Sequence, residues 1–246
     1  MRIDLYLQEA GLAPSRSRAK AMIEEGMVEL DGKIVDKPSL SVESGCNIRI
    51  LDTLRYVSRG GLKLEAALAA FCVSAAGRIA LDIGASSGGF TDCLLQNGAA
   101  YVYAIDSGVG QLAPALRDDG RVECREHCNA RYITPADFEK QPTLCVIDVS
   151  FISQTLILPA IAAILPEGGE LISLIKPQFE AGRSAIGKGG IVRSARDREA
   201  AVQRVLACAE ALSLTHLQTI PSPIRGGDGN IEYLAHFQKR KKEGKL

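Results

Sequence analysis

The sequence lacks the composition of several protein classes. It has no tryptophan, only 5% aromatic residues and no net charge, because 29 Lys and Arg balance 29 Asp and Glu. This balance excludes a protein coated evenly with basic charge, although local basic patches stay compatible with it. With 46% hydrophobic residues among 246, the chain has enough apolar material for one large domain and a small module.

No apolar run in the sequence is long enough to cross a membrane. The longest, 156–165, has about ten residues, whereas a helical span needs ~20. Asp4 interrupts the stretch in which a signal peptide would be apolar. We therefore expect a cytoplasmic protein with no membrane partner.

The sequence also lacks the cysteine and histidine spacings that are typical of metal sites and disulfide-bonded domains. The seven cysteines are an odd number without a C-x-x-C pair, and the three histidines lack the spacing of metal ligands. We expect free thiols in a reducing compartment and no metal. The oligomeric state has no signal in the sequence.

The first 52 residues predict a small unit of two helices and short strands. Ser15 is a good N-cap for the second helix, and Asp31-Gly32 is typical of a two-residue hairpin turn. The expected helices are 2–10 and 16–25, and the expected strands are 28–30, 33–35 and 47–51. We place this unit at residues 1–54, a linker at 55–62 and a larger domain at 63–246.

Short apolar runs alternate with helix-like stretches in the larger domain. The runs are continuous rather than alternating, which is typical of parallel strands covered by helices on both faces. The expected strands are 79–83, 101–106, 122–124, 144–148 and 171–176, and the expected helices are 91–97, 111–117, 153–165 and 194–212. Two further strands, 217–221 and 231–237, flank a glycine-rich turn. They predict a hairpin, and hence one antiparallel strand in a doubly wound α/β domain.

A glycine-rich segment, Leu-Asp-Ile-Gly-Ala-Ser-Ser-Gly-Gly-Phe-Thr at 81–91, lies at the first strand-to-helix turn, where open α/β sheets bind ligands. As a dinucleotide fingerprint it has Ser86 where a pyrophosphate needs glycine. As a nucleophile elbow it lies on the first strand, with little preceding chain for an oxyanion hole. A tight turn capped by Ser86 or Ser87, with no ligand, is a further alternative.

The same segment suits S-adenosyl-L-methionine, which has no phosphates. Small residues and backbone amides would pass beneath the methionine part, and Asp82 would orient the loop or face the ammonium group through water. Asp106, at the end of the second strand, is placed to accept hydrogen bonds from the ribose hydroxyls. The candidate cofactor residues of the loop are Asp82, Gly84, Ala85, Ser86, Ser87, Gly88, Gly89 and Phe90.

Four charged residues lie at the ends of otherwise apolar segments, namely Lys63, Asp148, Lys176 and Glu232. Burying a charge is costly unless it is paired, so each alone is more often a structural ion pair. Together with the glycine loop and Asp106 they indicate catalysis, because a desolvated lysine beside carboxylates can orient a ribose hydroxyl and take its proton. We expect Lys176 in this role, Asp148 and Glu232 to hold it, and Lys63 to bind the substrate ribose or phosphate.

These four residues resemble the Lys-Asp-Lys-Glu tetrad of the FtsJ-type ribose 2′-O-methyltransferases. The N-terminal unit, with Arg2-Ile3-Asp4 and the basic segment 15–20, resembles an S4 RNA-binding domain. The two together, with the linker 56–64 and the glycine-rich segment 187–192, are similar to the TlyA family, whose members are labelled both hemolysin and ribosomal RNA cytidine 2′-O-methyltransferase. Some members carry Arg-x-Trp-Val in the linker, which Arg55-Tyr56-Val57 only approximates.

The resemblance implies a class I methyltransferase fold, Rossmann-like, with a seven-stranded and mostly parallel sheet, one antiparallel strand and a small N-terminal α+β S4 domain. It implies S-adenosyl-L-methionine as cofactor and ribosomal RNA, within a ribosomal subunit, as partner. It also implies that Asn129 and Asp148 contact the cofactor. The chain is short for the family, which favours the subgroup that modifies 23S RNA alone over the one that also modifies 16S RNA.

Basic residues in two regions are candidate RNA contacts, because positive side chains at a helix start suit phosphates. They are Arg2, Arg16, Arg18, Lys20, Arg59, Arg183 and Lys188. An ordinary solvated helix face is the alternative for Arg16, Arg18 and Lys20. Two rival functions, a membrane-lytic protein and a non-catalytic RNA-binding or ribosome-assembly factor, are disfavoured by the lack of a membrane span and by the complete tetrad.

Overall fold

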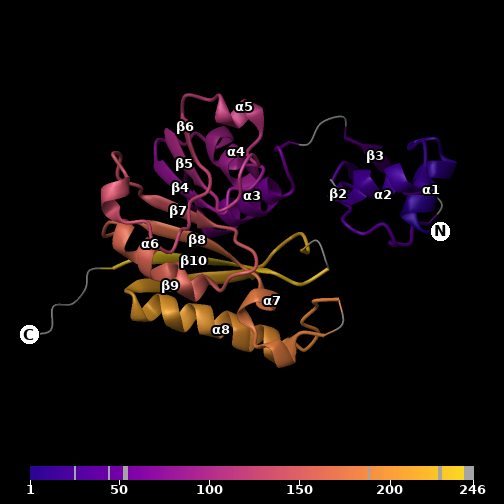
Figure 1. Cartoon of the computed structure of the whole chain (residues 1–246). Coiled ribbons are helices and arrows are strands. Elements are labelled where there is room, and N and C mark those ends of the chain that lie inside the picture. The colour runs from indigo at the N-terminus through magenta and orange to yellow at the C-terminus, as the bar shows by residue number, and fades with distance from the viewer. Residues whose placement is uncertain (25, 44, 52–54, 188, 227–228, 241–246) are drawn as a thin grey trace, which may run out of the picture. The chain divides into compact units, whose positions relative to one another are not determined.

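The computed structural model describes residues 1–24, 26–43, 45–51, 55–187, 189–226 and 229–240. The chain divides into two compact units, Met1–Arg59 and Gly60–Leu246 (Figure 1). Helix α3 (Gly60–Phe71) begins at the division. The last residues of the linker expected at 55–62 are therefore helical.

The small unit shares one core between two helices and a three-stranded antiparallel sheet. The elements are α1 (Ile3–Glu9), α2 (Arg16–Glu24), β1 (Val28–Leu30), β2 (Lys33–Ile34) and β3 (Ile48–Ile50), with the strand order β2-β1-β3. The hydroxyl of Ser15 accepts a hydrogen bond from the backbone N–H of Arg18 at 3.2 Å, which caps α2. Asp31 and Gly32 have φ of 49° and 79°, as a two-residue hairpin turn with two left-handed positions requires. The expected cap and turn are confirmed.

The larger unit is built on a seven-stranded sheet with the order β6-β5-β4-β7-β8-β10-β9. The strands are β4 (Ile79–Ile83), β5 (Tyr101–Ile105), β6 (Val122–Arg125), β7 (Leu144–Ile147), β8 (Glu170–Ile175), β9 (Leu214–Pro221) and β10 (Tyr233–Lys239). Strand β10 runs antiparallel to both of its neighbours, while β4 to β8 pair in parallel. The predicted fold, mostly parallel with one antiparallel strand, is confirmed.

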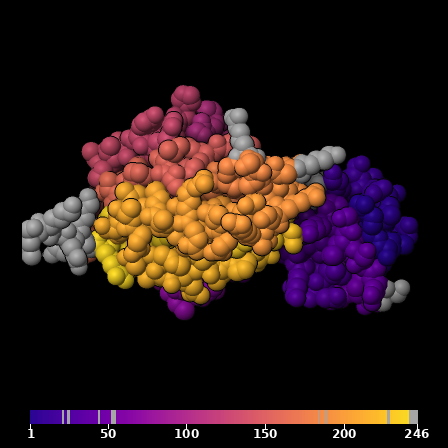
Figure 2. Space-filling view, turned by 90° about the horizontal axis from the view of Figure 1, so that it is seen from below, coloured from indigo at the N-terminus to yellow at the C-terminus, as the bar shows by residue number. Residues whose placement is uncertain are grey.

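Helices cover both faces of this sheet (Figure 1). Helices α6 (Leu158–Ile164) and α8 (Ala195–Ala211) share a core with alternate residues of the strands, and Figure 2 looks onto the side that α8 covers. Helix α3 and helix α4 (Gly89–Gln96) pack together over the opposite face. Strand β7 is buried throughout and β4 is buried from its second residue on, which explains why both are apolar except for Asp82.

Two of the expected helices are much shorter in the structure. The helix expected at 111–117 is reduced to α5 (Pro114–Arg117), because the carboxylate of Glu126 accepts the backbone N–H groups of Gly110, Gln111 and Leu112 and holds them in a loop. The helix expected at 153–165 is a 3₁₀ turn, η2 (Gln154–Leu156), followed by α6. Proline lacks an N–H and is tolerated only in a first helical turn, so Pro159 marks the start of α6.

The order of the strands creates a switch point beside β4. The chain proceeds from β4 through β5 to β6 on one side and then crosses to β7 and β8 on the other. Ligands of open α/β sheets bind outside the carboxyl ends of the strands at such a point. In the described part of the chain, no helix has the length and hydrophobicity of a membrane span.

Candidate active site

A cavity of about 640 Å³ opens at the carboxyl ends of β4, β5, β6 and β7. Its volume is in the range of small-molecule sites. The segments that follow these four strands line it with Gly84, Ser86, Asp106, Ser107, Gly108, Gln111, Cys128, Asn129, Ala130, Asp148, Val149, Ser150, Phe151 and Ile152, together with the strand residues Ile83 and Ile105 and with Ile157, between η2 and α6. The cavity thus lies at the switch point.

The structure brings part of the expected cofactor set to this cavity. Lining residues are Gly84, Ser86, Asp106, Asn129 and Asp148. The other expected residues, Asp82, Ala85, Ser87, Gly88, Gly89 and Phe90, do not line it. Phe90 and Asp82 lie in the interior, with 3% and 0% of their surface exposed.

The glycines of the loop are required by close packing against protein. Gly84 and Gly88 have φ of 85° and 98°. A Cβ atom at Gly84 would overlap the carbonyl oxygen of Asp148, and one at Gly88 would overlap the side chain of Leu116. The loop therefore passes directly against the residue that follows β7.

The backbone amides of the loop are largely used within the protein, which differs from the expectation that they are exposed for a ligand. Gly84 and Ala85 donate to the carbonyl oxygen of Ile105 at 2.8 and 3.1 Å, and Gly88 donates to Ala85 at 2.7 Å. The amide of Ser86 donates to Asp106 Oδ2 at 2.8 Å. Few N–H groups are left to bind a pyrophosphate.

Asp106 fixes both loops that border the cavity. Its Oδ2 accepts the N–H of Ser86, and its Oδ1 accepts the N–H of Gly108 at 2.7 Å. Each carboxylate oxygen has a second acceptor position, so the group can still receive the hydroxyls of a ribose.

Asp82 lies beneath the glycine loop and has a perturbed pKa. Its Oδ2 accepts a hydrogen bond from the hydroxyl of Thr91, in α4, at 2.7 Å. Desolvation raises the pKa of Asp82 to about 7, opposed by the Thr91 hydrogen bond, and the charges of Asp148 and Asp106 raise it further. Asp82, which precedes the glycine loop, therefore connects β4 to the first turn of α4.

The first of two ion pairs at the strand ends joins Lys176 to Asp148. Lys176 Nζ lies 2.6 Å from Asp148 Oδ1 and donates a hydrogen bond to Ser150 Oγ at 2.9 Å. Both partners come from the segment after β7. Asp148 and Ser150 also line the cavity, so Lys176 Nζ stands at its edge.

The second ion pair joins Lys63, in α3, to Glu232. Lys63 Nζ donates to Glu232 Oε2 at 2.6 Å, and only 11% and 2% of the two side chains are exposed. A Cβ atom at Gly226 would overlap Glu232 Oε1, so glycine leaves room for this carboxylate. Glu232 was expected to hold Lys176, whereas its ion pair is with Lys63.

The two ion pairs lie on neighbouring strands. Tyr233 of β10 pairs with Ile175 of β8, so Glu232 and Lys176 are the adjoining residues on these strands. All four predicted catalytic residues therefore meet at one edge of the sheet. A lysine that is held by a carboxylate and a hydroxyl at the edge of a cavity can orient a substrate hydroxyl and accept its proton.

The sequence did not single out most of the residues that line the cavity, and two of them bear on its chemistry. Ser150 is a partner of Lys176, and Phe151 is 91% exposed with a φ of 64°. The ring of Phe151 lies 5.1 Å from that of Phe179. The only sequence signal was their position shortly after Asp148.

The amide oxygen of Asn129 accepts hydrogen bonds from the backbone and the side chain of Arg131. The NH₂ group of Asn129 is therefore the part of this side chain that is suited to a ligand.

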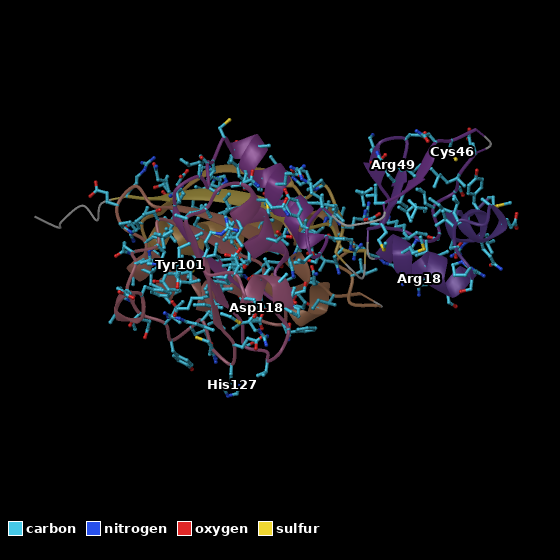
Figure 3. All side chains as sticks on the ribbon, turned by 90° about the horizontal axis from the view of Figure 1, so that it is seen from above. Arg18, Cys46, Arg49, Tyr101, Asp118 and His127 are labelled. Atoms are coloured by element: carbon cyan, nitrogen blue, oxygen red, sulfur yellow. The ribbon has the colours of Figure 1, made fainter. Side chains whose placement is uncertain are left out.

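A buried carboxylate organises two of the predicted RNA contacts in the small unit. Arg2 donates two hydrogen bonds of 2.9 Å to Asp4, and Arg16 Nε donates a third of 2.9 Å. The Arg2 hydrogen bond is the main reason that the pKa of Asp4 is lowered to about 2. Arg18 and Lys20 are exposed on α2, and Figure 3 shows Arg18 on that helix.

The remaining predicted RNA contacts are separate from these. Arg59 packs across Gly26, at the end of α2. Arg183 begins the 3₁₀ turn η3 (Arg183–Ala185), and Lys188 lies outside the described residues.

Within the described ranges no group of His, Cys, Asp and Glu side chains is arranged to hold a metal ion. His127 lies at the exposed tip of a loop (Figure 3).

The seven-stranded sheet, with β10 between β8 and β9 and a cavity at its switch point, defines a doubly wound α/β domain with a ligand-binding site. The chain belongs to the FtsJ-like methyltransferase family, whose model matches residues 56–239. Residues 1–47 match the S4 domain model.

Known relatives match the chain over most of its length. YqxC of Bacillus subtilis, provisionally named an rRNA methyltransferase, is 48% identical over 96% of this chain and 85% of its own. A Mycobacterium tuberculosis relative named 16S/23S rRNA (cytidine-2′-O)-methyltransferase TlyA is 42% identical over 94% and 87%. A solved structure from Streptococcus thermophilus, which carries a hemolysin name, is 48% identical over 98% and 89%, with a TM-score of 0.77.

Replacing Asp82 by asparagine is expected to remove a pH dependence of stability. Because the pKa of Asp82 is raised from 3.8 to about 7, its stabilising contribution is complete below about pH 4 and is lost as the pH rises towards 7. At about 1.4 kcal/mol per pH unit, the wild type should lose about 3 kcal/mol of unfolding free energy between pH 5 and pH 8 relative to Asp82→Asn. Urea unfolding at both pH values measures this difference.

The control is Asp118→Asn, which changes an exposed aspartate (Figure 3). It should leave the pH dependence of the wild type in place. Parallel pH profiles for the wild type and Asp82→Asn would contradict the assignment of this dependence to Asp82.

Proposed function

We propose that the protein transfers a methyl group from S-adenosyl-L-methionine to the ribose 2′-hydroxyl of a cytidine in ribosomal RNA. In this proposal residues 1–54 bind RNA, 55–62 link the units and 63–246 carry out the transfer. The reaction takes place on ribosomal subunits in the cytoplasm. The observation that carries the proposal is the Lys176–Asp148 pair at the edge of the switch-point cavity.

The charges of the cavity favour a cationic cofactor. Among the described residues that line it, Asp106 and Asp148 are carboxylates and none is lysine or arginine. A dinucleotide would place its pyrophosphate near these carboxylates, with few loop amides left to bind it. S-adenosyl-L-methionine instead carries an ammonium and a sulfonium, which acidic and carbonyl groups stabilise.

The pairs at the strand ends fit the transfer of a methyl group to a hydroxyl. The cofactor supplies an electrophilic methyl group on sulfur. Lys176, an ammonium in its ion pair with Asp148, first releases a proton to solvent. The neutral amine then takes the hydroxyl proton while the O–CH₃ bond forms and the S–CH₃ bond breaks, with its electron pair kept by sulfur. Asp148 and Ser150 hold Nζ in place, and Lys63, kept by Glu232, is suited to bind the ribose or an adjacent phosphate.

RNA as the acceptor is supported by features of both units. The small unit matches the S4 domain model and exposes basic side chains on α2. In the larger unit the exposed ring of Phe151 borders the cavity, where an unstacked base can lie against it. The proposal takes 23S RNA as the main substrate, because one relative is named for 23S RNA alone, and 16S RNA as a second one, because the M. tuberculosis relative is named for both.

The function is tested by incubating the protein with purified large and small ribosomal subunits and methyl-labelled S-adenosyl-L-methionine. A 2′-O-methyl group blocks alkaline cleavage, so the label should be recovered in an alkali-resistant dinucleotide that begins with cytidine. Label in another position of the nucleotide would contradict the chemistry. Cofactor binding without transfer to either subunit would contradict the enzyme and favour a non-catalytic assembly factor.

Replacement of Lys176 is expected to stop transfer and spare cofactor binding. Lys176→Ala should lower kcat by about 100-fold or more, which is the usual contribution of a general base. Lys176→Arg should be equally impaired, because a guanidinium keeps the charge but cannot accept the proton. Single-turnover methylation and calorimetric titration with the cofactor measure the two effects. Near-normal transfer by Lys176→Arg would show that only the positive charge matters.

Replacement of Asp4 by asparagine is expected to weaken RNA binding. The change removes a negative charge, so charge alone predicts tighter binding, whereas loss of the group that orients Arg2 and Arg16 predicts weaker binding. We expect an affinity for subunit RNA lower by about tenfold, about the same as for Arg16→Ala. Filter binding measures it.

The matched control is Glu9→Gln, which removes an exposed charge at the end of α1. It should bind RNA as tightly as the wild type or slightly more tightly. Tighter binding by Asp4→Asn, with its circular dichroism unchanged, would contradict the positioning role of Asp4.

A further inference from the structure

The segment after β7 delivers both partners of Lys176, and its backbone is strained. Asp148 and Ser150 contact Lys176 Nζ at 2.6 and 2.9 Å. Between them and η2 lies Phe151, with a φ of 64°. A left-handed conformation of a non-glycine residue costs on the order of 1 kcal/mol, so neighbouring groups must impose it.

A buried carboxylate, that of Glu180, holds the end of this segment. Helix α7 (Pro177–Glu180) begins directly after Lys176 and ends in Glu180, which is 2% exposed. Glu180 Oε1 accepts the backbone N–H of Gln154 at 2.8 Å, and Oε2 accepts the hydroxyl of Ser153 at 2.5 Å. Glu180 thus holds the end of the segment that begins at Asp148.

The same polar cluster holds the strand that carries Lys176. The side-chain amide of Gln154 contacts two residues of β8. Its Nε2 donates a hydrogen bond to the carbonyl oxygen of Leu174 at 2.6 Å, and its Oε1 accepts one from the hydroxyl of Ser173. Arg204 of α8 donates to the backbone carbonyl of Glu180. The end of β8, α7 and the segment after β7 are therefore joined in one buried network.

We propose that Glu180 is a positioning residue for methyl transfer, which fixes the segment 149–154 so that Asp148 and Ser150 reach Lys176 together. The inference rests on the proposed function, because it concerns the same site. Glu180 does not line the cavity and touches no reacting group. It acts through Ser153 and Gln154.

The burial of Glu180 distinguishes this role from a contribution to folding. Desolvation raises the pKa of Glu180, since its hydrogen bonds from Gln154 and Ser153 only partly offset it. A raised carboxyl pKa means that stability is greatest below the ordinary value of 4.5 and is lost as the pH rises through the raised one. A glutamine has the same shape and no charge, so it avoids this desolvation cost, but its NH₂ group cannot accept one of the two hydrogen bonds that hold the segment.

The experiment compares Glu180→Gln with Glu170→Gln. Both are glutamates near β8, but Glu170 lies at its opposite end, where it contacts Arg78 and His236. For Glu180→Gln we expect a Tm close to that of the wild type, because the relief of desolvation offsets the lost hydrogen bond, a kcat lower by about tenfold or more, and a cofactor Kd within about twofold. For Glu170→Gln we expect a lower Tm and an unchanged kcat.

A second readout needs no methyl transfer. Trace labelling of the folded protein with acetic anhydride, followed by mass spectrometry, reports the accessibility of the Lys176 amine. If Glu180 holds its partners in place, labelling of Lys176 should become severalfold faster in Glu180→Gln and stay unchanged in Glu170→Gln.

The outcomes separate the two proposals. Transfer by the wild type together with a kcat of Glu180→Gln within about twofold of it would overturn the positioning role and leave the proposed function intact. Absence of transfer by the wild type would overturn the proposed function. In that case unequal labelling of Lys176 in the two variants would still support positioning, and equal labelling would overturn it as well.

Discussion

The contact between Lys176 and Asp148 is the interaction on which the site depends. An ammonium and a carboxylate stand at the ends of two adjacent buried strands, where an unpaired charge would be costly. Their separation of 2.6 Å ties β8 to β7 at the edge of the cavity. The glycine loop is also fixed at this place, because Gly84 packs against the backbone of Asp148.

Charge pairing of this kind recurs in both units and in several cases joins distant segments. Glu232 reaches Lys63 across 169 residues of chain, and Asp4 gathers Arg2 and Arg16 in the small unit. In each case a nearly buried carboxylate sets the position of a basic side chain that is suited to RNA or to its ribose. The acids of this neutral chain thus organise its bases, and net charge alone conveys nothing of that arrangement.

Local patterns in the sequence predicted most of the fold. Continuous apolar runs located the buried strands, and Asp31-Gly32 located a hairpin, because both depend on neighbouring residues only. Long-range geometry was not accessible in this way. Glu232 pairs with Lys63 because β10 is inserted beside β8. A loop replaces most of the helix expected at 111–117 because Glu126, in another segment, binds its backbone N–H groups.

The most direct test of the central claim is a structure of the protein with S-adenosylhomocysteine and an RNA fragment that contains the modified cytidine. The account predicts the ribose O2′ of that cytidine within hydrogen-bonding distance of Lys176 Nζ and in line with the cofactor sulfur, which lies in the cavity beside Asp106 and Asp148. A base atom, or another ribose hydroxyl, in that position with Lys176 turned away would contradict it.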